Sequence, residues 1–267
     1  PHEVGFIGSL MNNNITDSIW SFLFSVSTVQ SFDPASGQLT GKVPISAGGN
    51  LPFSHGNILL NHANDTGYVL QNGTGTLFGI FALSGDASNN DITSLLPVSS
   101  KVVSFDTDTN KIGAGLTLTP QIFAATPDAG NIVMAYASNM AISNDDTTGY
   151  AYVTVGLRGV NGAPGTFTDY IVPINLATMT VAGVPVAVPI APSLQNYCQQ
   201  HTDDCDPSIG GAFLFSFLGI GMEAQPQSNR IWIRSFGRLA YIDPTEAQPS
   251  VHDIDLGQYV DSPDLNN

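Results

Sequence analysis

A repeated hairpin constrains the fold of this chain more than any other feature of its sequence. Four six-residue segments align without gaps; each ends in Asp or Asn, and each is followed by a short polar turn and a second β-like run. The segments are Thr28–Asp33, Lys101–Asp106, Tyr170–Asn175 and Arg238–Asp243. Their last residues are 73, 69 and 68 positions apart. An Asp or Asn side chain that opens a turn accepts a hydrogen bond from a backbone amide about two residues on, so each segment predicts a β-hairpin.

Two further strand candidates precede each hairpin. They are rich in aromatic and β-branched residues and are bounded by Gly, Asn and Asp, which is typical of strands. The first set comprises Val4–Leu10, Gly56–Asn61, Gly130–Ala137 and Gly211–Leu218. The second set comprises Ser18–Phe24, Thr66–Gln71, Thr148–Val155 and Asn229–Ser235. The sequence therefore predicts an all-β chain of about four units, each with four antiparallel strands and roughly 70 residues.

The units are placed at about residues 1–50, 51–122, 123–192 and 193–267 of a single domain, since no Pro- or Ser-rich run or charge block divides the chain. Four antiparallel strands repeated radially are the plan of a β-propeller. The units fit a closed four-bladed ring as well as part of a larger one. The same strands also fit a β-sandwich, which is the alternative fold.

The stretch Thr148–Pro189 resembles the YVTN-type propeller repeat. In that repeat a Tyr-Val-Thr strand, here Tyr152–Thr154, precedes a strand ending in Ile-Asp and a Thr-rich turn, here Ile174, Asn175 and the turn after them. The segment Lys101–Leu118 shows the second half of the same pattern. The resemblance implies a propeller fold and carries no activity with it, because one fold hosts many functions.

The charge balance excludes several classes of partner. Seven cationic residues face 22 acidic ones, which gives a formal net charge of −15. Such a surface repels phosphate backbones and anionic lipids, so we expect neither nucleic acid nor a membrane surface as a partner. The longest apolar run, Gly210–Met222, has 13 residues. A membrane-spanning helix needs about 20, so this run is interpreted as core strand.

The two cysteines, Cys198 and Cys205, are separated by six residues. This gap is too wide for a CxxC redox motif, and two thiols alone do not make a structural zinc site. A local disulfide is favoured over a metal cluster with His201, and it predicts a secreted protein in an extracellular or periplasmic compartment. The start at Pro1 fits a mature end after removal of a signal segment. Scarce lysine and glycosylation sequons agree with secretion, the sequons being Asn14, Asn64 and Asn72.

Asp106, Asp108 and Asn110 supply alternating oxygen ligands, as at the start of an EF-hand calcium loop. The sixth position is Lys111 where that loop needs Gly, and the twelfth is Thr117 in place of Glu. The segment also occupies a hairpin turn of the repeat. A polar turn is therefore favoured, with Ca²⁺ kept as a candidate cofactor.

A second acidic stretch surrounds Cys205 and lies close to His201; it consists of Asp203, Asp204 and Asp206. It occurs in one unit only and interrupts the repeat, as functional insertions on a repeat scaffold often do. An exposed solvated loop is the alternative. If one loop binds a cation or a partner, this is the first candidate.

No catalytic set stands out. The chain lacks a G-x-S-x-G elbow, and its only glutamates for glycoside hydrolysis are Glu3, Glu223 and Glu246. We therefore expect an extracellular, non-enzymatic binding or structural module that engages protein, glycan or its own copies at the cell surface. The alternative is a metal-dependent propeller hydrolase, lactonase-like or glycosidase-like, with Glu223, Asn57 and Asn131 as inner-strand candidates.

The two tryptophans, Trp20 and Trp232, occupy matching second strands of the first and fourth units. Aromatic side chains on a lectin stack on sugars, but packing between blades is the more common use. The match favours a core position for both.

Overall fold

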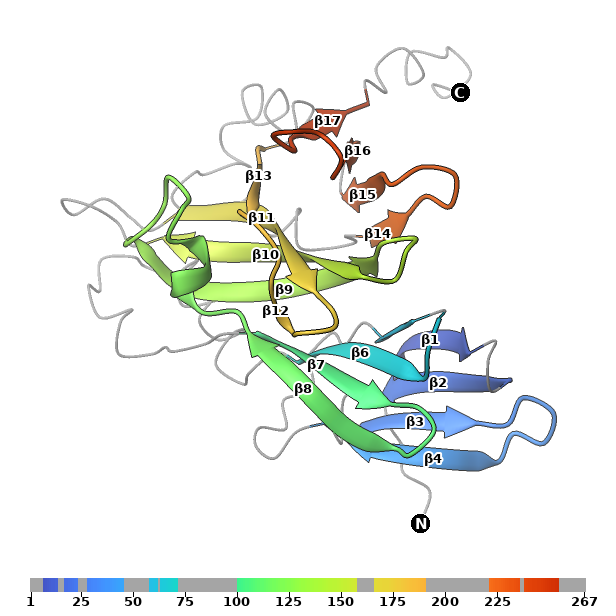
Figure 1. The fold of residues 1–267 in the computed structure, drawn as a ribbon. Coiled ribbons are helices and arrows are strands. Elements are labelled where there is room, and N and C mark those ends of the chain that lie inside the picture. Colours follow the sequence, from blue (N-terminus) through green and yellow to red (C-terminus); the bar gives the residue numbers. More distant parts are fainter. Residues whose placement is uncertain are drawn as a thin grey trace, which may run out of the picture.

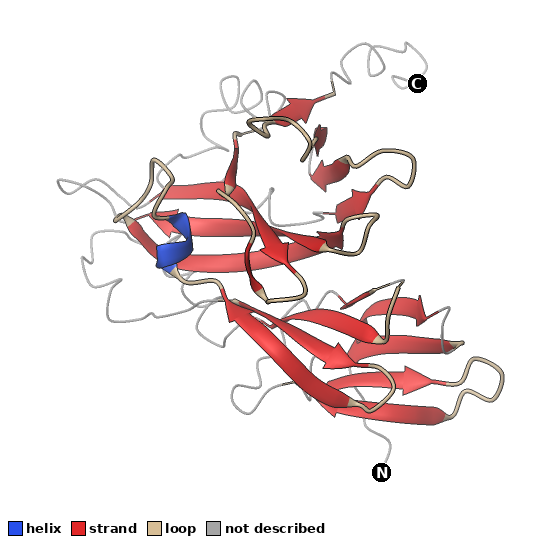
Figure 2. Ribbon diagram, viewed as in Figure 1, coloured by secondary structure: helices blue, strands red, loops and turns tan. Residues whose placement is uncertain are grey.

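The computed structural model describes residues 7–13, 17–23, 28–45, 58–61, 63–71, 100–157, 166–190, 221–235 and 238–254. These residues form four antiparallel sheets, drawn as arrows in Figure 1 and in red in Figure 2. The helical element in the described ranges is a short 3₁₀ turn, η3 (Pro120–Phe123). No helix within these ranges is long and apolar enough to cross a membrane. The all-β prediction is confirmed.

Neighbouring strands of each sheet are consecutive in the chain, except that the last strand of the third sheet pairs with the strand two before it. The first sheet contains β1 (Ile7–Asn13), β2 (Ser18–Leu23), β3 (Thr28–Phe32) and β4 (Leu39–Pro44). The second contains β5 (Ile58–Leu60), β6 (Thr66–Gln71), β7 (Lys101–Asp106) and β8 (Lys111–Thr117). The third contains β9 (Ile132–Ile142), β10 (Thr148–Leu157), β11 (Thr166–Asn175), β12 (Thr180–Val181) and β13 (Val186–Val188). The fourth contains β14 (Gly221–Ala224), β15 (Ile231–Ser235), β16 (Arg238–Ile242) and β17 (Val251–Asp253).

The four repeated segments are the third strands of the sheets. Each pairs antiparallel with the strand that follows its turn, so the hairpin prediction is confirmed. The predicted second strands also coincide with β2, β6, β10 and β15 to within a few residues.

One strand prediction falls outside the described residues, and one needs correction. The first strand of the fourth sheet is Gly221–Ala224, which pairs with β15; the predicted Gly211–Leu218 lies outside the described residues. In the third sheet the predicted run after the Asn175 turn divides into β12 and β13, which both pair with β11. Gly183 and Pro185 lie between them, and proline has no amide to donate to a sheet.

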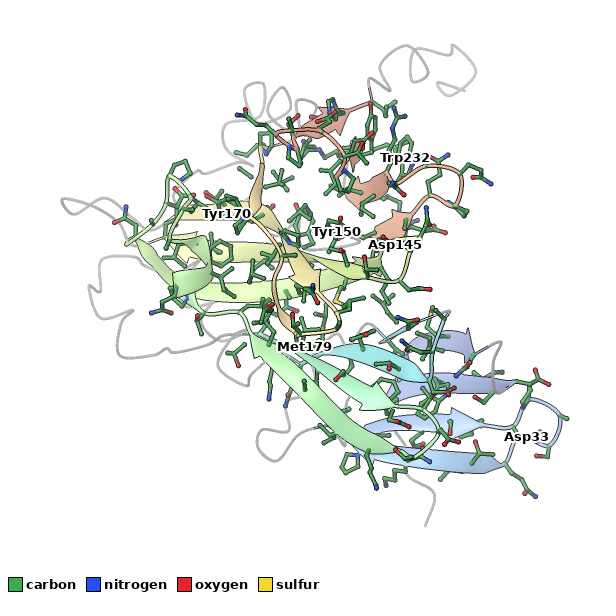
Figure 3. The ribbon with its side chains drawn as sticks, viewed as in Figure 1. Asp33, Asp145, Tyr150, Tyr170, Met179 and Trp232 are labelled. Atoms are coloured by element: carbon green, nitrogen blue, oxygen red, sulfur yellow. The ribbon has the colours of Figure 1, made fainter. Side chains whose placement is uncertain are left out.

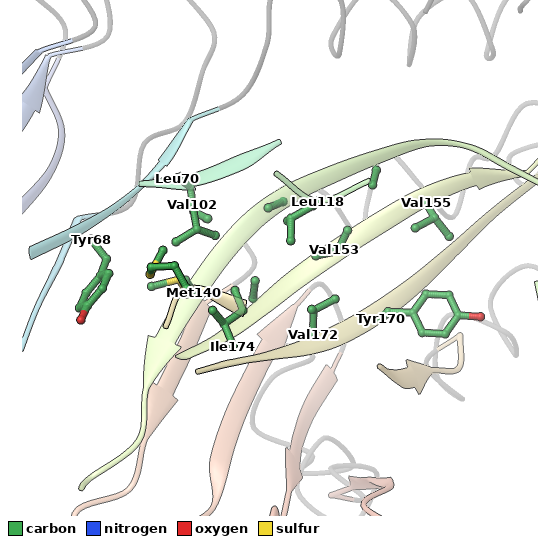
Figure 4. Close-up of a cluster of buried hydrophobic side chains, with 14 of the residues drawn as sticks. Tyr68, Leu70, Val102, Leu118, Met140, Val153, Val155, Tyr170, Val172 and Ile174 are labelled. Carbon is green, nitrogen blue, oxygen red and sulfur yellow. The ribbon is translucent and has the colours of Figure 1, made fainter. Parts of the chain in front are cut away.

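Hydrophobic clusters lie between consecutive sheets. The cluster between the first and second sheets contains Trp20, Val29, Val69 and Phe105. The cluster between the second and third contains Leu70, Val102, Val153 and Val172, as Figure 4 shows. The cluster between the third and fourth contains Tyr152, Ile171, Ile231 and Ile242. Within the described ranges, none of these clusters joins the first sheet to the fourth.

The sheets therefore pack face to face in chain order, from the first at the lower right of Figure 1 to the fourth at the top. A β-sandwich has two such layers, whereas this chain stacks four. The architecture is a propeller-like array of blade-like sheets, as predicted, with four strands in three of the sheets and five in the third.

Candidate functional site

The two edges of the array carry different connections. At one edge, which we call the turn edge, short connections join first to second strands and third to fourth strands. In three sheets the first of these turns is closed by the same pair of backbone groups: Asn61 N–H to Thr66 C=O, Ser143 to Thr148, and Gln225 to Arg230. Connections between second and third strands and between sheets begin and end at the opposite edge, the connection edge.

At the turn edge, the last residue of each repeated segment caps its own hairpin turn. Asp106 Oδ1 accepts the backbone amides of Asp108 at 3.0 Å and Thr109 at 2.6 Å. The same bond recurs in the other three sheets, from Ala35 and Ser36 to Asp33, from Thr178 to Asn175, and from Thr245 to Asp243. The Asp or Asn that ends each repeated segment of the sequence is therefore the residue that caps the turn.

The candidate calcium residues all lie in this second turn. Asp106 is engaged by turn amides, and Asn110 adopts a left-handed φ of 57°. The Asn110 Oδ1 atom is buried against Gly41 of the preceding sheet. It lies 2.0 Å from the position that a Cβ atom on this glycine would occupy. Within the described residues no three His, Cys, Asp or Glu side chains gather in a metal-binding group. These contacts fit the polar-turn interpretation, and Ca²⁺ at this turn stays a prediction.

The carboxylates that cap the turns predict how the stability of the folded chain changes at acidic pH. The amide of Thr109 and then its hydroxyl lower the pKa of Asp106. A lowered pKa contributes stability above the unfolded value, about 4, that is lost as pH falls through the folded value. Asp106→Asn keeps the acceptor, as Asn175 does in the third sheet. We expect a somewhat lower melting temperature at pH 7, because the neutral amide lacks the charge that strengthens the capping bond, and a smaller loss on acidification. Circular dichroism at pH 7 and 3 measures both.

The matched control is Asp108→Asn, which removes the same charge from an exposed position in the same turn. It should leave the acid-induced loss of melting temperature as it is in the wild type. Equal behaviour of the two variants would contradict a capping role for the Asp106 carboxylate.

Asparagine side-chain amides form hydrogen bonds from each sheet to the next along the turn edge. Asn13 Nδ2 donates to the Thr107 hydroxyl at 3.4 Å, and Asn61 Nδ2 donates to the Asp146 carbonyl at 3.2 Å. Asn144 Nδ2 bridges to the fourth sheet, donating to the carbonyls of Gln225 and Ser228. Hydrogen bonds at the turn edge thus join neighbouring sheets as well as the strands within each sheet.

A polar cluster lies between the third and fourth sheets, towards the connection edge. We call it the junction cluster; its members are Tyr152, Thr154, Asp169, Arg238 and Asp253. Arg238 is 7% exposed. Its Nε and Nη2 donate to the two carboxylate oxygens of Asp253 at 2.5 and 2.8 Å, and its Nη1 donates to the Pro189 carbonyl at 2.6 Å.

Asp169, on β11, accepts hydrogen bonds from the hydroxyls of Tyr152 at 2.8 Å and Thr154 at 2.6 Å. Burial raises the pKa of Asp169, against the opposing effect of the two hydroxyls and of Arg238. A carboxyl with a raised pKa can serve as a proton donor, but here both of its oxygens accept hydrogen bonds from hydroxyls of the neighbouring strand β10. The junction cluster therefore anchors the fourth sheet and the start of the connection after Pro189.

The junction cluster was not among the sequence candidates. The sequence gives only a weak signal for this cluster. Asp169 immediately precedes one repeated segment, and Arg238 is the first residue of another. The other three segments begin with Thr28, Lys101 and Tyr170. Neither residue type in isolation indicates a partner in another unit.

Several sequence candidates lie outside the described residues: Asn14, Asn57, Asn72, Cys198, His201, Asp203, Asp204, Cys205 and Asp206. The disulfide and the acidic binding loop therefore stay predictions. Among the described candidates, Asn64 is exposed and its side chain accepts the Thr66 amide at 3.0 Å. Asn131 is exposed in the turn before β9, and Glu223 is exposed on β14.

No protein-family model matches the sequence, and no curated protein is detectably similar to it. Among solved structures, the chain resembles the major allergen Mala s 1 of Malassezia sympodialis, with a TM-score of 0.53 and 12% identity over 92% of this chain and 62% of that one. It resembles Kuenenia stuttgartiensis hydrazine synthase with a TM-score of 0.51 and 10% identity, over 88% and 51% of the two chains. The TM-score with a Xanthomonas campestris gluconolactonase is 0.44, with 13% identity over 94% of this chain and 62% of that one.

The chain thus spans between half and two thirds of the length of the structures it resembles. Of the two structures with TM-scores above 0.5, hydrazine synthase has a β-propeller-type fold, and at such low identity the likeness concerns the fold alone. It agrees with the propeller-like array seen here. The resemblance to the YVTN-type repeat in particular stays a prediction.

Proposed function

We propose that this chain is an extracellular or periplasmic, non-enzymatic binding or structural module, whose rigid sheets present recognition segments at the connection edge. The observation that carries the proposal is the asymmetry between the two edges. Capped turns and asparagine links close the turn edge. The longest stretches of sequence between consecutive described strands, which include residues 72–99 and 191–220, leave from strands that end at the connection edge. Binding proteins commonly place recognition on connections held by a rigid scaffold.

The junction cluster supports a role for the connection after β13. Arg238 holds the Pro189 carbonyl at the point where this connection leaves the third sheet. The connection contains Cys198 and Cys205, which we propose form a disulfide. Between and beside them lie His201, Asp203, Asp204 and Asp206, the proposed recognition residues. Their acidity favours cationic groups on a protein or an amine-bearing glycan as the partner.

A binding experiment tests this role. Wild-type protein is applied to an array of glycans and purified extracellular proteins, next to a variant in which His201, Asp203, Asp204 and Asp206 are all replaced by Ala. The control variant carries Asp33→Asn, Asp108→Asn and Asp243→Asn, which remove three acidic charges from the turn edge. We expect the loop variant to lose the binding that wild type and control share.

The same preparations should show no turnover of lactones or aryl glycosides above the rate in buffer. Array binding that the loop variant retains in full would contradict recognition by this connection. Multiple turnovers that disappear in Glu223→Gln would contradict the non-enzymatic function itself and favour a propeller hydrolase.

A further inference from the structure

Each sheet carries an aromatic residue at one matching position of its second strand. This residue pairs directly with the third-strand residue two positions before the capping Asp or Asn, in the pairs Trp20–Ser31, Tyr68–Ser104, Tyr150–Pro173 and Trp232–Tyr241. In the first three sheets the aromatic side chain is 1%, 3% and 8% exposed. There it belongs to the cluster shared with the following sheet.

Trp232 occupies this position in the fourth sheet but is only partly buried and belongs to none of the clusters described above. Its neighbours Ile231 and Ile233 face the third sheet. Because successive side chains of a strand alternate between faces, Trp232 points away from the third sheet. Figure 3 labels Trp232 on the fourth sheet and Tyr150 on the third. The repeat thus places an interface aromatic on a face that no described sheet covers.

The outward face also differs from the covered faces of the first and second sheets in a second respect. Beside Ser31 and Ser104 the fourth strands have glycine, Gly41 and Gly113, and the space at Gly41 is taken by Asn110 of the following sheet. The fourth sheet has His252 beside Tyr241 instead. The fourth sheet therefore offers no glycine at the place that corresponds to Gly41, where Asn110 enters.

The larger side chains form a ladder across three strands. The rings of Trp232 and Tyr241 are 5.3 Å apart, and Tyr241 stacks on His252 at 4.9 Å. The Arg230 guanidinium lies 4.3 Å above the Tyr241 ring, and His252 Nε2 is 2.7 Å from Glu246. The ladder is therefore preorganised, which lowers the entropy cost of a contact.

Charge on this face points to the kind of partner. The chain has four arginines and two tryptophans, and the face holds Arg230, Arg234 and Trp232. Tryptophan, tyrosine and arginine are the residues that dominate the binding energy of protein interfaces. Glu223 lies on the same face, opposite Trp232. A face with both signs of charge can pair with its own copy about a two-fold axis, which is the commonest symmetry of soluble oligomers.

We propose that the outward face of the fourth sheet is the contact through which two copies of this chain form a symmetric dimer. The face comprises Glu223, Arg230, Trp232, Arg234, Tyr241 and His252. It lies on a blade face and not at the connection edge, so the dimer goes beyond the recognition function proposed above and can fail independently of it.

Sedimentation equilibrium between about 1 and 100 µM tests the dimer, because this range brackets the affinity of ordinary self-association. The wild-type mass should rise from 28.1 kDa towards twice that value. Arg234→Glu reverses an exposed charge on the face, and Trp232→Ala removes the central aromatic. Each should weaken dimerisation at least ten-fold, with far-ultraviolet circular dichroism unchanged. Lys42→Glu, the matched reversal at an exposed position of the first sheet, should leave the dimer intact.

A wild-type chain that stays monomeric over the whole range would overturn the proposal. So would an oligomer that Lys42→Glu dissociates while Arg234→Glu and Trp232→Ala do not, because its contact would then involve the first sheet.

Discussion

Arg238→Met should destabilise the folded chain by about 3–5 kcal/mol, the usual cost of removing one partner of a buried ion pair. The Arg238 side chain is 4% exposed and that of Asp253 is 28% exposed. Methionine fills much of the same volume but leaves the Asp253 carboxylate and the Pro189 carbonyl without their donor. Urea unfolding followed by far-ultraviolet circular dichroism measures the change in free energy.

The double variant Arg238→Met with Asp253→Leu is the control for that loss. It removes both charges, so it should recover much of the stability lost in the single variant. A loss below about 1 kcal/mol in the single variant would place the pair among exposed ion pairs and contradict its role in anchoring the fourth sheet.

Trp20→Ala should have an effect of similar size, about 3–5 kcal/mol, because it opens a cavity between the first and second sheets. Trp20 is 1% exposed, its ring lies 5.2 Å from that of Phe105, and its indole N–H donates to the Ser18 hydroxyl at 3.0 Å. The same urea titration measures the loss.

Trp232→Ala is the matched control, since it makes the same substitution at the matching position of the fourth sheet. Measured at a concentration where the chain is monomeric, it should cost less than half as much, because Trp232 is only partly buried. Equal losses at the two positions would mean that the outward face of the fourth sheet is covered within the monomer.

The hairpins could be predicted from sequence because their determinants are local. The turn, its capping Asp or Asn and the flanking strands lie within about a dozen residues, and the capping bond joins residues two or three apart. The first described strand of the fourth sheet, β14, was not among the predicted strands, because its determinant is pairing with another strand and is not local. The run before Met222 is more apolar than β14 itself, and pairing with β15 decides the strand.

The link between the two halves of the junction cluster could not be predicted from the sequence because it joins residues of different units. The bond from Arg238 to Pro189 spans 49 residues, and Asp169 is further still from Arg238 in the chain. Trp20 and Trp232 show the limit of a repeat argument. Their matching positions predicted a core role for both, yet Trp20 is buried and Trp232 faces outward from the last described sheet.

We hold that the recurring acidic residues stabilise turns and leave the sheets as a scaffold for recognition. Calorimetric melting of the purified chain in Ca²⁺ and in EDTA, with its metal content measured beforehand, tests this most directly. We expect the two melting temperatures to agree within about 1 °C and the bound metal to be well below one per chain. A stoichiometric metal, with melting lowered by about 5 °C or more in EDTA, would contradict it, since a bound ion stabilises the folded state on that scale.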